Sequence, residues 1–241
     1  MPATTWKTTG ALLGVALLTS PAMLSYELPL GSHSIREAYF LGQRNDEKMS
    51  RFLETYTKRP ATPEQGPWIS EIKLFTPYAD VVDVSRRNTI GYSAQQAQED
   101  YKQRGELVRA YVRIEFTPTY GFAQATESAD KVGREHHVRL DAQEFWREFQ
   151  FRLLQTEEPP AGSQEATRSP RRFVIDPVRS SAEPIYDLRY ASSLGPAAPL
   201  LGAMVCLDYD AHDVSSQLTE FQVLSPDGQR VSVTFDLSKL R

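Results

Sequence analysis

The sequence predicts an α+β fold in which a helical N-terminal segment packs on, or precedes, an antiparallel β-sandwich. Two observations predict this class. In the first third of the chain, apolar residues recur at helical spacing, as at Met49, Phe52, Leu53 and Tyr56. From residue 106 onwards they recur at every second position, which is the period of a half-buried strand.

Residues 1–24 have the layout of a signal peptide. Lys7 is the only charged residue in them, the apolar run 11–18 follows, and small residues lead to Ala22. The run is shorter than the roughly 20 apolar residues that a membrane-spanning helix needs. The sequence therefore predicts export to the periplasm or the outside of a bacterial cell. The alternative is a buried N-terminal helix, and the cleavage site stays open.

Residues 25–105 are predicted to be mainly helical. Ser34 and Glu37 have the spacing of a capping box, which predicts a helix beginning at Ser34. A second helix carries the apolar stripe described above and ends before Pro60. Gly42 either separates these two helices or kinks one long helix.

A strand and two further helices complete the N-terminal part. Residues 68–75 alternate in polarity and predict a strand. Pro77 suits the first position of a short helix. Ser93 begins another capping box, and it opens a polar helix that Gly105 ends.

Residues 106–241 are predicted to form the sandwich. In the first strand, Val108 to Phe116 places alternate apolar residues on one face and Arg109 among the polar residues of the other. Further strands are predicted at 149–153, 172–176, 184–190, 203–210, 219–224 and 230–237. The last two should form a hairpin through the turn residues of 225–228, where Pro and Gly suit the turn.

Residues 156–171 contain no aromatic or large aliphatic side chain and are rich in Pro, Glu, Ser and Thr. Such a stretch buries too little surface to offset its ordering entropy, so we expect it to be mobile. It is either a linker or an insertion in a hairpin. The strands on both sides need partners, which favours the insertion.

Composition excludes some classes of function. The net charge is −4, which opposes general binding to nucleic acid or to an anionic membrane surface. Cys206 is the only cysteine, so no intramolecular disulfide can form, and its place within a predicted strand indicates a buried, unreactive thiol. The pattern Gly91–Gln95 lacks the second glycine of a nucleophile elbow, and Ser93 there is better explained as a helix cap.

One group of residues suggests a metal site. Asp208, Asp210, His212 and Asp213 lie within six positions, and on a strand Asp208 and Asp210 share a face. Oxygen ligands at this spacing suit calcium. The run resembles the acidic calcium-binding loop of C2 domains, where an Asp-x-Asp leaves a strand, over about seven residues. The alternative is an exposed strand end that the aspartates turn by local hydrogen bonds.

Apolar residues offer a second possible surface. The apolar loop 195–202 could mark a contact site or fill one end of the sandwich. Several aromatic side chains could line a protein or carbohydrate surface, although packing is the more common role of aromatics: Trp68, Tyr111, Tyr120, Phe122, Phe145 and Trp146.

These observations predict an exported, non-enzymatic binding or envelope-associated protein with no cofactor other than calcium. Its partner would be a protein or a carbohydrate, and no stable membrane span would remain after leader removal. The alternative is a calcium-binding module or a metal-dependent hydrolase centred on Asp208, Asp210 and Asp213.

Overall fold

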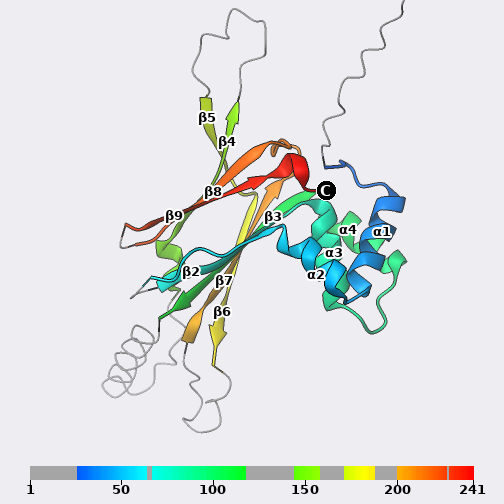
Figure 1. The fold of residues 1–241 in the computed structure, drawn as a ribbon, viewed down its shortest axis with the longest axis horizontal. Helices are drawn as coiled ribbons and strands as arrows, with labels where there is room; N and C mark the ends of the chain where they lie inside the picture. Colours follow the sequence, from blue (N-terminus) through cyan, green and yellow to red (C-terminus); the bar gives the residue numbers. More distant parts are fainter. Residues whose placement is uncertain (1–25, 64–66, 118–143, 158–170, 188–199, 227) are drawn as a thin grey trace, which may run out of the picture.

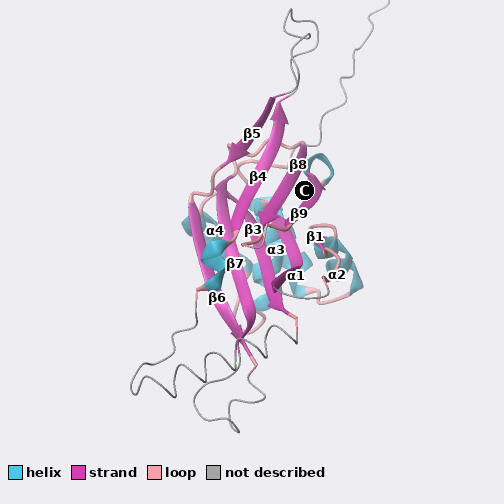
Figure 2. Ribbon diagram, turned by 90° about the vertical axis from the view of Figure 1, so that its left-hand side faces the viewer, coloured by secondary structure: helices cyan, strands magenta, loops and turns pink. Residues whose placement is uncertain are grey.

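The computed structural model describes residues 26–63, 67–117, 144–157, 171–187, 200–226 and 228–241. In these residues two antiparallel sheets face each other, and a layer of helices lies beside them (Figure 1). Figure 2 shows the same arrangement from the side, with the strands of both sheets in front of most of the helices. The predicted α+β class with a sandwich-like pair of sheets is therefore confirmed.

The first sheet has five strands in the order β1-β2-β3-β7-β6. Their bounds are β1 (Thr57–Lys58), β2 (Pro67–Phe75), β3 (Leu107–Phe116), β7 (Leu200–Asp210) and β6 (Arg179–Tyr186). Since β2 joins β3 in this sheet, the segment predicted to be mainly helical also supplies two strands of the sandwich.

The second sheet has four strands in the order β5-β4-β8-β9. They are β5 (Arg171–Ile175), β4 (Gln150–Glu157), β8 (Leu218–Leu224) and β9 (Arg230–Asp236). The predicted hairpin of β8 and β9 is present, and its turn is closed by a hydrogen bond from the Gly228 amide to the Ser225 carbonyl.

The core lies between the two sheets. In β3, Val108, Ala110, Val112 and Ile114 are fully buried, as the alternation predicts. They share one hydrophobic cluster with residues of the other sheet, such as Phe221. The period-two pattern thus identifies the inner face correctly.

Four helices are seen in the described residues: α1 (Ser32–Gln43), α2 (Glu47–Glu54), α3 (Pro77–Arg87) and α4 (Ala94–Arg104). They form a second hydrophobic cluster of their own, and α3 also contacts β2 and β3. None of the helices in this described part has the length and apolar character needed to cross a membrane.

Three helix starts follow from capping side chains. Asp46, Thr76 and Ser93 each accept a hydrogen bond from an amide three residues later. The predicted cap at Ser34 is wrong, because α1 begins at Ser32 and the Ser34 hydroxyl donates to Glu27 instead.

The role expected for Gly42 is also wrong. It lies inside α1, where a Cβ would stand 2.4 Å from the Val82 carbonyl oxygen of α3. Glycine is needed there because the two helices approach closely. The break between α1 and α2 comes at Asn45, whose φ is +48°.

The strand that contains Pro184 differs from the prediction at both of its ends. The strand expected at 184–190 runs from Arg179 to Tyr186, so Pro184 lies inside it. β6 is an edge strand, where a missing amide donor is tolerated. The ends of the insertion predicted at 156–171 are strand instead, because β4 runs to Glu157 and β5 begins at Arg171. Residues 158–170 lie outside the described part, and since β4 and β5 pair, the insertion lies within a hairpin.

Candidate functional site

A cluster of buried charged residues joins α3 to the outer face of the five-stranded sheet. We call Asp80, Arg104, Arg109 and Asp208 the ion-pair cluster. The Arg109 Nε atom lies 2.6 Å from Asp208 Oδ1, and Arg109 Nη1 lies 3.0 Å from Asp80 Oδ1. Arg104 Nη1 binds the other oxygen of Asp80 at 2.5 Å. Arg109 thus bridges a carboxylate on a strand and a carboxylate on a helix.

Strand register explains why arginines lie next to Asp208. Arg109 of β3 and Arg179 of β6 are both direct cross-strand partners of Asp208 in β7. Arg179 Nε lies 3.7 Å from Asp208 Oδ2 and stays largely exposed. Asp80 comes from α3, where it occupies the first turn after the Thr76 cap.

Burial makes the cluster energetically important. The side chains of Arg109 and Asp208 are only 11% and 5% exposed. Burial alone disfavours a charged Arg109, but the charge of Asp80 and the hydrogen bond to Asp208 outweigh it and raise the pKa of Arg109. Because each charge has an opposite partner, the cluster orients α3 on the sheet.

Cys206 and Tyr111 lie next to the cluster on the same face of the sheet, as direct cross-strand partners. The Cys206 sulfur lies 3.7 Å from Asp208 Oδ1. Burial, followed by the nearby Asp208 charge, raises the pKa of Cys206 from 9.0 to about 12. The thiol therefore stays protonated at neutral pH, which agrees with an unreactive cysteine and does not suit a nucleophile.

We expect Cys206 to react slowly with iodoacetamide in the folded protein. At pH 8, a pKa of about 12 in place of 9.0 lowers the thiolate fraction about a thousandfold. Labelling would be followed by mass spectrometry, with protein unfolded in guanidinium chloride as the control. Equal rates in the two samples would contradict the protonated state.

The structure places the four predicted metal ligands in different surroundings. The Asp208 carboxylate binds Arg109. Asp210 lies at the end of β7, and its Oδ1 atom accepts hydrogen bonds from the backbone amide of His212 (2.9 Å) and from His212 Nδ1 (3.0 Å). These bonds lower the pKa of Asp210. His212 and Asp213 are exposed, and the Asp213 amide donates to the Asp210 carbonyl.

Asp210, His212 and Asp213 therefore form a local turn of the kind that Asx hydrogen bonds produce. Across the residues that the structure describes, no three His, Cys, Asp or Glu side chains are grouped as a metal site would require. Calcium binding through these residues stays a prediction.

Thermal unfolding with calcium and with a chelator tests it. We expect the two melting temperatures to agree for the native chain, because Arg109 already satisfies Asp208. A calcium-dependent increase that Asp210→Ala abolishes would instead establish the metal site. Ser216→Ala, in the connection that follows, is the matched control.

The structure describes some of the residues of the other predicted surfaces. Phe145 and Trp146 pack against the core, and Trp68 lines a cavity of about 60 Å³ with Phe149 and Val231. Phe145 and Trp146 therefore pack within the fold. Ser93 is a helix cap, as predicted.

Several predicted positions lie outside the described residues. These are Tyr120, Phe122 and the first part of the apolar loop, residues 195–199. The end of that loop is already strand, because β7 begins at Leu200. Comparison of the chain with protein-family models, with curated proteins and with solved structures gives no match.

Proposed function

We propose that this chain is an exported, non-enzymatic binding protein that works outside the reducing cytoplasm. The observation that carries the proposal is the position of Tyr26. This residue follows the predicted leader closely, yet it is only 4% exposed and belongs to the core between the sheets. Its hydroxyl donates to the Ala211 carbonyl at 2.9 Å. The folded part thus extends to within a few residues of the predicted cleavage region.

Cleavage at the predicted site would keep Tyr26 in the mature chain. Cleavage near Ala22 would remove none of the described residues and would leave a short segment before Tyr26. A signal peptide is removed without loss of structure only where the mature fold does not depend on it.

The binding role is supported by the way the charged groups are used. In the described residues, the carboxylates of the ion-pair cluster face arginines that neutralise their charge. Cys206 beside it is held as a thiol. Such an arrangement builds a rigid scaffold and supplies no activated nucleophile, which favours recognition of a protein or carbohydrate partner over catalysis.

Expression in a Gram-negative bacterial host tests export. We expect the full chain to reach the periplasm with a new N-terminus between residues 21 and 26, identified by mass spectrometry of the purified protein. A variant with Leu13→Arg and Leu17→Arg should stay uncleaved in the cytoplasm, because the charges interrupt the apolar run. Thr4→Arg, outside that run, is the control and should still be exported.

Retention of the native chain in the cytoplasm with residues 1–24 intact would overturn the proposal of export. A chain beginning at residue 25 should melt at the same temperature as the full chain purified with residues 1–24 intact. A lower melting temperature would show that the leader contributes to the fold, which is the alternative of a buried N-terminal helix.

A further inference from the structure

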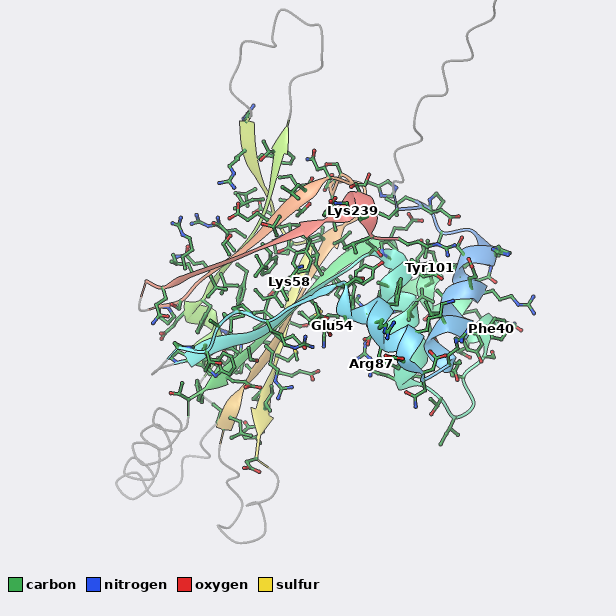
Figure 3. All side chains as sticks on the ribbon, viewed as in Figure 1. Phe40, Glu54, Lys58, Arg87, Tyr101 and Lys239 are labelled. Carbon is green, nitrogen blue, oxygen red and sulfur yellow. The ribbon has the colours of Figure 1, made fainter. Side chains whose placement is uncertain are left out.

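An open groove lies between α3 and α4 in the helical layer. Its volume is about 440 Å³, which falls within the range of about 300–1,000 Å³ that small-molecule sites occupy. Figure 3 labels Arg87, which lines the groove from the last turn of α3. The full lining is Val84, Arg87, Asn88, Asp100, Gln103 and Arg104.

Arg104 connects this groove to the ion-pair cluster. Its Nη1 atom binds Asp80, and its Nε atom donates to the Asp100 carbonyl at 3.2 Å. Its Nη2 atom is buried and has no hydrogen-bond partner among the described residues. A buried charged donor without an acceptor costs free energy, so an incoming acceptor would be favoured there.

Arginines outnumber acidic residues among the side chains that line the groove. Two arginines and one aspartate line the groove, and the Asp100 carboxylate already accepts a hydrogen bond from the Tyr92 hydroxyl at 2.9 Å. Arg87 is held in place by Asp83 at 2.8 Å and by a hydrogen bond to Tyr111, while half of its side chain stays exposed. Both guanidinium groups are therefore positioned by internal partners, and both arginines line the groove.

We propose that this groove binds a small carboxylate through Arg104 and Arg87. A guanidinium group offers two parallel N–H donors that match the two oxygens of a carboxylate. The ligand would supply the acceptor that Arg104 Nη2 lacks, after a small turn of a side chain that is 24% exposed. Asn88 and Gln103 add neutral polar groups for the remainder of a small polar molecule.

The inference rests on the proposed binding role and names a ligand class for it. The probe is sodium succinate, titrated into the purified full chain and followed by NMR of the arginine side-chain N–H signals. Sodium chloride at matched ionic strength is the reference. We expect saturable shifts at the signals of Arg87 and Arg104.

Three variants separate the site from nonspecific charge effects. Arg87→Gln and Arg104→Gln should each weaken succinate binding by about tenfold, since a hydrogen bond to a charged group is lost. Arg86→Gln is the matched control, because Arg86 also pairs with Asp83 and is 41% exposed but does not line the groove. It should leave binding unchanged.

Linear, unsaturated shifts in the native chain would overturn the carboxylate site, and so would an equal loss in Arg86→Gln. Inorganic phosphate that binds as tightly as succinate at the same signals would overturn the choice of a carboxylate. If Arg104→Gln fails to fold, Arg87→Gln alone decides. None of these outcomes bears on export, so failure here is distinguishable from failure of the proposed function.

Discussion

Arg109→Met should destabilise the protein by about 3–5 kcal/mol, since removal of one partner leaves a buried charge uncompensated. Asp208 would keep only the distant Arg179, and Asp80 would keep only Arg104. The free energy of unfolding would be measured by urea denaturation. A second substitution, Asp208→Leu, should restore part of the lost stability in the double variant, because it removes the carboxylate that Arg109→Met leaves unpaired.

Arg113→Met is the matched control for Arg109→Met. Arg113 lies on the same strand and the same face, but its side chain is 43% exposed and its partner is Glu115. Exposed ion pairs contribute about 0–1 kcal/mol, so we expect a small change. If both variants lost the same stability, the ion-pair cluster would not hold α3 on the sheet.

The sequence predicts the inner faces of the sheets well, because burial on one face imposes a period of two. The residues Val108 to Ile114 show this, and so does the hairpin of β8 and β9. The order of the strands within each sheet does not follow from the sequence pattern. β3 pairs with β7, which is about ninety residues later in the chain, and nothing in local periodicity encodes such a pairing.

The candidate site depends on that missing information. In the sequence, Asp208 is a predicted metal ligand because Asp210 and Asp213 follow it closely. Its actual partner, Arg109, is predicted to lie on the polar face of its strand, and the structure adds that α3 covers that end of the face. Only the register of β3 against β7 together with the position of Asp80 on α3 brings the three side chains together.

Phe221→Ala should cost about 3–5 kcal/mol in the free energy of unfolding, because it removes a large buried ring and leaves a cavity. Phe221 is fully buried between the sheets, opposite Leu153 of β4 and Val233 of β9. Both neighbouring strands therefore lose contacts at once.

Gln222→Ala is the control for Phe221→Ala, because Gln222 is the next residue of the same strand and points to the opposite face. It is only half-buried and donates a hydrogen bond to Glu220, so we expect a change of about 0.5 kcal/mol. Urea denaturation with unchanged slope would show that both variants expose the same amount of surface on unfolding.

If the two substitutions had equal effects, the four-stranded sheet would not present Phe221 to the five-stranded sheet. The sandwich depends on that contact, since β8 supplies the inner face from the centre of its sheet.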